Sequence, residues 1–391
     1  MRSRYPMLPV CLVGVLAPLA AESIDLNLAG SLQLDYLFTP FTSADPRPAT
    51  HTLDGFTEEL SLKLAIDISP HASANVKVCY GCHGFEVGMA YVDFRLGDAF
   101  NIRAGRFSPT FGEFGLRHDP GNHRLSDKPL PYDMGRMLRM GEFGRSVLPS
   151  PYVDNGIELS GSHFFGPRFQ MSYAAYAVSG LRAQTDTPYD VDFVASHSAS
   201  PFYIDNNSQP SVGGRLGFNA RLADRVDLSF GGSAMWGAYD TRARMTYTVL
   251  GADLFLRVVR TNVRAEYLVR RTDMYAADQA RFEYALTPSA VGVLPESVFQ
   301  VRDGWYVEVE QPILRNLDLI LRWDGMRRRG NTAPGSAVDF SSGVSRWTLG
   351  AQYVIERGYR VKASAESYSW WGLRSGVTQD WAFHLGAVAT F

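Results

Sequence analysis

The chain has 391 residues, with 38 Lys plus Arg against 40 Asp plus Glu, so its formal net charge is −2. This balance argues against a nucleic-acid-binding protein, which needs an excess of positive charge. The 19 Tyr, 23 Phe and 36 Gly are typical of a membrane β-barrel with aromatic residues at both interfaces.

Residues 1–21 have the features of a secretory signal peptide. Arg2 and Arg4 give the positive start, residues 7–19 are mostly apolar, and Ala20 and Ala21 fit a cleavage site. The apolar stretch is shorter than the about 20 residues of a membrane-spanning helix. We therefore expect a mature chain that begins near Glu22, is exported to the outer membrane of a Gram-negative-type bacterium, and forms one barrel domain over residues 22–391.

Alternation of apolar and polar residues predicts strands along most of this domain. In residues 24–38, Ile, Leu and aromatic side chains occupy every second position except Gly30, while Asp25, Asn27, Gln33 and Asp35 are among the residues between them. Similar segments recur up to the last one, which ends on Phe391. This is the pattern of an all-β, antiparallel outer-membrane barrel with apolar side chains toward lipid and polar ones toward the lumen.

Seven short polar turns separate pairs of these strands, at residues 69–71, 97–98, 166–167, 223–225, 260–262, 315–316 and 357–358. With both termini on the periplasmic side, seven periplasmic turns predict sixteen strands. The longest connection spans residues 108–154 and is too long to lie free in a compact barrel. We expect this third loop to fold back into the lumen as a constriction loop.

Residues 90–112 read AYVDFRLGDAFNIRAGRFSPTFG, and Val153-Asp154-Asn155-Gly156 opens the strand after the third loop. These segments resemble the phosphate-selective porin family and its relatives. The resemblance implies a 16-stranded pore that is commonly trimeric. The lysine cluster on which that family's phosphate selectivity depends does not map onto this chain, so the resemblance does not extend to phosphate as substrate.

The predicted lumen positions carry both signs of charge, among them Lys77, Asp93, Arg95, Arg103, Glu158 and Arg215. Rings of one sign confer ion selectivity, so a mixed lining predicts no anion preference. The sequence has no nucleophile–base motif, and we expect no enzyme.

Cys79, Cys82 and His83 form the pentapeptide Cys-Tyr-Gly-Cys-His, the attachment motif of c-type haem. The motif predicts one haem c, with thioether bonds to the two thiols and His83 as the proximal iron ligand. The alternative is a Cys79–Cys82 disulfide that braces a short hairpin. A zinc site is disfavoured because a fourth ligand is missing.

Strand alternation places Cys79 toward the lumen and also predicts a lumen orientation for Phe85, Val87 and His83. His118 or His123 of the third loop is then the candidate distal iron ligand, against the alternative that both are solvated loop residues.

These features predict a porin-like outer-membrane channel that carries a covalent haem and takes part in electron transfer at the outer membrane. The alternative is a plain diffusion porin for small solutes or anions, with the disulfide and no haem. Expected partners are membrane lipid, lipopolysaccharide, small solutes, periplasmic or extracellular cytochromes, and two further copies in a trimer; nucleic acid is not expected.

Overall fold

The computed structural model describes residues 24–43, 52–81, 84–133, 146–148, 150, 152–183, 193–194, 205, 207–239, 242–274, 298–330, 342–372 and 377–391. The predicted signal peptide, Cys82 and His83 lie outside these residues. No helix in the described ranges is long and apolar enough to span a membrane.

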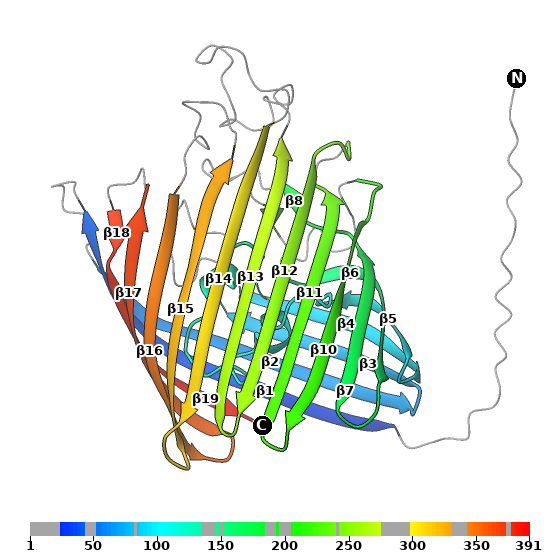
Figure 1. Ribbon diagram of the computed structural model, residues 1–391, viewed down its shortest axis with the longest axis horizontal. Coiled ribbons are helices and arrows are strands. Elements are labelled where there is room, and N and C mark those ends of the chain that lie inside the picture. Colours follow the sequence, from blue (N-terminus) through cyan, green and yellow to red (C-terminus); the bar gives the residue numbers. More distant parts are fainter. Residues whose placement is uncertain are drawn as a thin grey trace, which may run out of the picture.

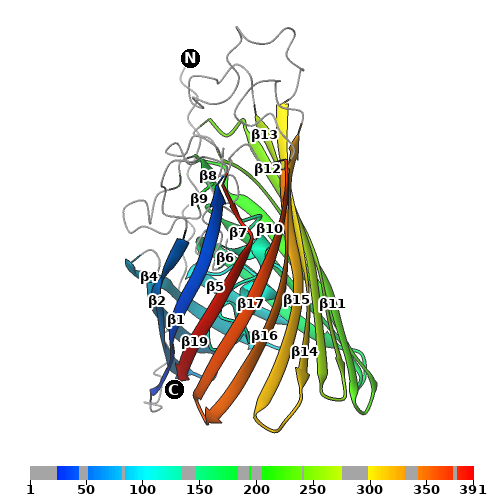
Figure 2. The ribbon, with the colours of Figure 1, turned by 90° about the vertical axis from the view of Figure 1, so that its left-hand side faces the viewer.

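The described residues form a closed antiparallel barrel of sixteen strand positions, which confirms the predicted fold class (Figures 1 and 2). The short strand β18 and the strand β19 that follows it share one strand position in the barrel, because both pair with β1. A separate two-stranded sheet contains β8 (Arg182–Ala183) and β9 (Phe193–Val194). The barrel strands are β1 (Asp25–Ser43), β2 (Thr52–Ser69), β3 (Ala72–Gly81), β4 (Gly84–Gly97), β5 (Phe100–Phe107), β6 (Asp154–Phe164), β7 (Phe169–Val178), β10 (Ser211–Ala223), β11 (Val226–Ala238), β12 (Thr246–Val258), β13 (Thr261–Met274), β14 (Val298–Pro312), β15 (Leu317–Gly330), β16 (Ser342–Glu356), β17 (Tyr359–Trp371), β18 (Val377–Gln379) and β19 (Trp381–Thr390).

The barrel closes where β1 pairs with β19, in a register that runs from Ser31 opposite Thr390 to Phe38 opposite Phe383. Beyond this ladder, the Gly30 amide donates to the Phe391 carbonyl at 3.0 Å. Closure removes the free sheet edge that lipid could not satisfy. A closed barrel with an apolar outer face is the fold of outer-membrane porins.

The strands alternate as the sequence predicts. In β1, Leu26, Leu28 and Leu34 are exposed on the outer face, whereas Gln33 and Asp35 are buried on the inner face. All seven predicted turns join neighbouring strands at one end of the barrel, which faces the bottom and lower right of Figure 1. Short turns mark the periplasmic end of such barrels.

One predicted orientation is wrong. Phe85 and Val87 of β4 were expected in the lumen, but both are exposed on the outer face, Phe85 by 72%. The cause is a β-bulge: Lys77 pairs with Met89 and Val78 pairs with Val87, so Gly88 is an extra residue. A bulge shifts the alternation by one residue, which reverses every side chain beyond it.

Candidate functional site: the barrel lumen and its third loop

The third loop enters the lumen after β5, which confirms the inward-folded loop of the predicted fold. Its described residues include two 3₁₀ turns, Phe114–Arg117 and Leu130–Tyr132. Phe111, Phe114, Leu130 and Tyr132 are buried inside the barrel. A loop with this many buried apolar residues is packed into the barrel rather than solvated, so its contacts with the wall decide how far the lumen is open.

One group of contacts joins the start of the loop to β13. The Glu113 amide and the Tyr132 hydroxyl both donate to Oε1 of Glu266, at 3.0 and 2.5 Å. The Arg264 guanidinium donates in return to the Glu113 carboxylate at 2.8 Å. Gly112 makes this approach possible, because its φ of +63° suits glycine and a Cβ there would collide with Glu266. The loop is thereby tied to one side of the wall.

A second group ties the middle of the loop to β15 and β16. Oδ2 of Asp127 lies 2.5 Å from one nitrogen of Arg322 and 2.5 Å from one nitrogen of Arg346. All three side chains are fully buried. The two arginines also contact wall carboxylates of β14, β15 and β17, namely Glu308, Asp324 and Glu366. Asp127 therefore completes a buried network of alternating charges.

Two lysines hold the loop at its turn. Lys362 of β17 donates to the carbonyls of Pro120 and Leu125 at 2.9 and 3.1 Å. Lys77 of β3 forms an ion pair with Asp119 and donates to the neighbouring His118. The loop is thus attached both to β17 and to β3, which lie four strand positions apart around the barrel.

Both candidate iron-ligand histidines are buried in this loop. Nε2 of His118 lies 2.9 Å from Nζ of Lys77, and its Nδ1 lies 2.7 Å from the Gly115 carbonyl. Burial, together with Lys77, lowers the pKa of His118 to about 4, so the ring is neutral and uses both nitrogens. Nδ1 of His123 contacts the Leu125 carbonyl at 2.8 Å, and the ring packs against Phe114. The alternative of solvated loop histidines does not hold.

The half of the lumen away from the short turns contains an apolar core that the alternation of the strands does not predict. Inward-facing residues of several strands pack against the loop, including Met235, Tyr247, Val249, Leu268, Met326 and Val344. Outward neighbours such as Leu250 are also apolar, so the alternation is lost locally. Adjacent apolar residues such as Val249-Leu250 and Leu268-Val269 were the available signal. They mark wall segments that contact lipid on one face and protein on the other.

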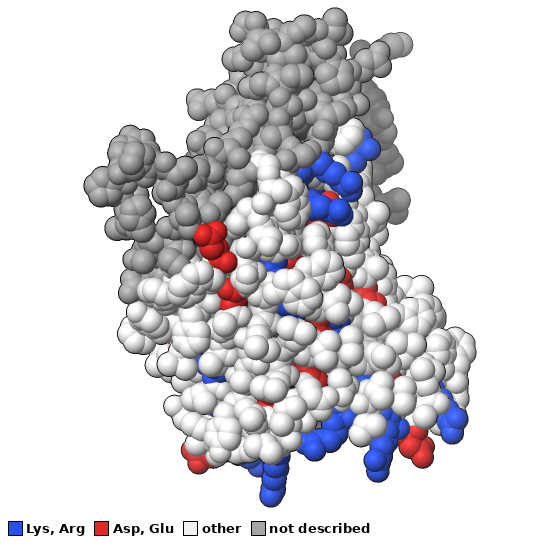
Figure 3. All heavy atoms as spheres, turned by 60° about the vertical axis from the view of Figure 1, so that its left-hand side comes forward, with Lys and Arg blue, Asp and Glu red and all other residues white. Residues whose placement is uncertain are grey.

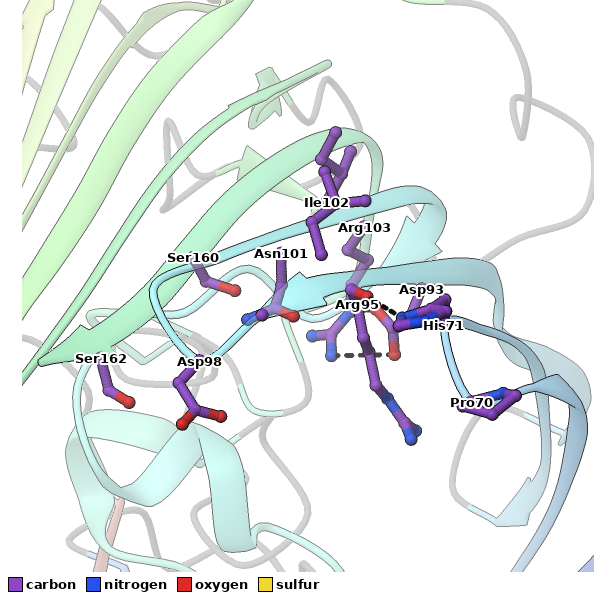
Figure 4. Close-up of a pocket in the computed structure, with 12 residues that line it drawn as sticks. Pro70, His71, Asp93, Arg95, Asp98, Asn101, Ile102, Arg103, Ser160 and Ser162 are labelled. Carbon is purple, nitrogen blue, oxygen red and sulfur yellow. Dashed lines mark hydrogen bonds and ion pairs between the residues drawn. The ribbon is translucent and has the colours of Figure 1, made fainter. Parts of the chain in front are cut away.

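The periplasmic half is polar and opens to solvent. A cavity of about 610 Å³ lies there. It is lined by residues of the first two turns and of β4, β5 and β6, which Figure 4 shows. Arg103 extends across it and donates to Asp93 at 2.8 Å, while Arg95 points away from that pair. Arg103 also lies 4.6 Å from the ring centre of Tyr91.

The proposed pore-lining residues lie on the lumen face, and most of them are paired. Arg215 contacts Asp253 at 2.6 Å. Glu158 accepts hydrogen bonds from the amide and hydroxyl of Thr110 and lies 3.7 Å from Arg103. Lys77 lies beneath the loop rather than in an open passage. These pairs neutralise the lining, as the mixed charges of the sequence suggested.

Of the haem motif, the structure describes Cys79. It lies on β3 two residues beyond Lys77, on the same face, and pairs in register with Ser61 and Glu86. A Cβ on Gly88 would lie 3.1 Å from the Cys79 sulfur, so the glycine of the bulge lets the β4 backbone approach the thiol closely.

The sequence matches no family model and no curated protein. Solved structures do resemble it. The outer-membrane channel DcaP of Acinetobacter baumannii is 12% identical with a TM-score of 0.57, covering 94% of this chain and 97% of that chain. OmpT of Vibrio cholerae with loop L8 deleted is 10% identical with a TM-score of 0.54, covering 95% and 100%.

An anion-selective porin from Comamonas acidovorans is 11% identical with a TM-score of 0.51, covering 94% of this chain and all of that one. At these identities the likeness establishes the fold. This chain has the closed sixteen-strand barrel of outer-membrane porins. Membership of the phosphate-selective family stays a prediction.

Proposed function

We propose that this protein is an outer-membrane channel for small polar solutes, and that the third loop controls its conductance. The observation that supports this most directly is the attachment of the loop across the lumen through Asp127, Lys362 and Lys77. A solute that crosses the barrel must pass between this loop and the wall, beginning from the polar cavity at the periplasmic end.

Planar-bilayer recording with the purified full chain tests the channel. We expect small, discrete conductance steps and a reversal potential close to zero in a salt gradient, because the lining arginines are paired with carboxylates such as Asp93 and Asp253. Correctly folded protein that inserts but gives no conductance steps would contradict the proposal. A strong anion selectivity would contradict the expectation that these pairs neutralise the lining.

A second candidate function adds redox chemistry. We propose that Cys79, Cys82 and His83 carry one haem c, which would supply a one-electron redox centre for transfer to partner cytochromes. It is supported by the motif itself and by the position of Cys79 on the lumen face of β3. One haem cannot cross a hydrocarbon layer of about 30 Å alone, so electron transfer across the membrane needs such partners.

Intact mass and the visible spectrum test the haem, in cells that mature c-type cytochromes. We expect a mass increment of one haem and a Soret band, both absent in Cys79→Ser. A mass lower by two hydrogens, without a Soret band, would instead establish the Cys79–Cys82 disulfide. The variant Lys77→Met removes the hydrogen bond to Nε2 of His118 and so frees that nitrogen to bind iron. A spectral shift in this variant that is absent in the double variant Lys77→Met/His118→Gln would assign His118 as the sixth ligand.

A further inference from the structure

The periplasmic rim of the barrel carries a row of arginines. Each of the last five of the seven periplasmic turns exposes one arginine, within the turn or directly after it, whereas the first two turns, at residues 69–71 and 97–98, have neither Lys nor Arg. Figure 3 shows basic side chains projecting along this lower end of the barrel. We call these residues the turn arginines: Arg168, Arg225, Arg260, Arg315 and Arg357.

The turn arginines differ from the lumen arginines in their partners. Arg103 and Arg215 of the lumen are paired with Asp93 and Asp253. Within the described ranges, no turn arginine forms an ion pair, a side-chain hydrogen bond or a ring contact, although the exposed Asp224 and Glu356 are adjacent in sequence to two of them. Exposed guanidinium groups of this kind are available to a ligand, and their planar fork matches the oxygens of a phosphate.

Large apolar side chains are exposed at the same turns. Leu222 precedes Arg225 by three residues, Val259 directly precedes Arg260, and Leu314 directly precedes Arg315. Val259 also has a φ of +58°, which a β-branched residue rarely adopts. A strained backbone that presents an apolar side chain beside an arginine suggests a site where both groups are used.

We propose that the turn arginines bind the phosphates of anionic phospholipids in the periplasmic leaflet, with the neighbouring apolar side chains in contact with the acyl region. Adjacent turns are two strand spacings apart, about 10 Å, and follow the circumference of the barrel. A curved row around a central lumen fits the lipid that surrounds the barrel better than the compact patch of one protein partner. Apolar residues beside basic ones are the usual composition of an interfacial membrane contact.

Spin-labelled lipids test this proposal with the refolded full chain in phosphatidylcholine vesicles. The measured quantity is the association constant of labelled phosphatidylglycerol relative to labelled phosphatidylcholine. We expect the wild type to prefer phosphatidylglycerol at low salt. The variant Arg225→Gln/Arg260→Gln/Arg315→Gln should lose that preference by about fivefold at each lipid site, in line with the usual effect of one arginine near a charged surface.

The matched control is Arg271→Gln/Arg327→Gln/Arg329→Gln, which removes three outward-facing arginines at the opposite end of the barrel. It should retain the preference. A wild type without preference, a turn variant that keeps it, or a control that loses it equally would each overturn the proposal. Conductance of all variants, recorded in parallel, reports on folding and on the channel function, so the two proposals fail independently.

Discussion

Substitution of Asp127 by Asn is the sharpest perturbation of the loop. It removes a charge from the contact with Arg322 and Arg346 while it keeps the size of the side chain. A hydrogen bond to a charged group contributes about 1.5–3 kcal/mol, so two such bonds give about 3–6 kcal/mol. Because Asp324 and Glu366 still contact Arg346, we expect the lower value, about 3 kcal/mol.

A change of this size alters the ratio of docked to undocked loop about a hundredfold. Single-channel recording should therefore show more frequent transitions to a larger conductance in Asp127→Asn than in the wild type. Asp224→Asn, at an exposed periplasmic turn, is the control for the loss of one negative charge. If Asp127→Asn folds and its conductance and open-channel noise equal those of the wild type, the loop does not control the passage.

Three further outcomes follow from single residues. Burial and Lys77 lower the pKa of His118 from 6.5 to about 4 in the docked loop, so below pH 6.5 the histidine binds a proton more readily when the loop is undocked. As the pH falls from 6.5 to 4, the free energy of docking should therefore weaken by up to about 3 kcal/mol. The conductance should rise over the same range, and it should rise less in His118→Gln. Gly112→Ala forces a left-handed residue against Glu266 and the Tyr132 hydroxyl, so limited proteolysis should cut the loop faster than in the wild type. Val259→Gly relieves a positive φ and should raise the free energy of unfolding in urea by about 1 kcal/mol; a decrease would show that the turn is unstrained.

The wall of the barrel was predictable because lipid and lumen impose a period of two on every strand. The seven turns followed from the same pattern, since each interrupts the alternation with residues that favour turns. The bulge at Gly88 was not predicted, because one extra residue leaves the segments on both sides alternating and changes only the phase of the alternation. A glycine within a strand was the available sign.

The attachment of the third loop could not be predicted in detail. Its partners lie far along the chain: Asp127 meets Arg322 across 195 residues, and Lys362 meets Pro120 across 242. From a single sequence we can predict that the long loop folds into the lumen and that charged residues line the wall. The sequence does not state which carboxylate meets which arginine, because that choice depends on the three-dimensional path of the loop.

The ion pairs that hold the two sides of the loop differ in strength. Toward β15 and β16, Asp127 and both arginines are fully buried, so their pairing is hardly screened by solvent. Toward β3, Asp119 is 32% exposed beside Lys77, and the pair is weaker for that reason. Loop movement should therefore begin on the β3 side, which adjoins the open cavity lined by β4 and β5. Cys79 lies on that same wall, so any group attached to its thiol would line the passage that the moving loop opens.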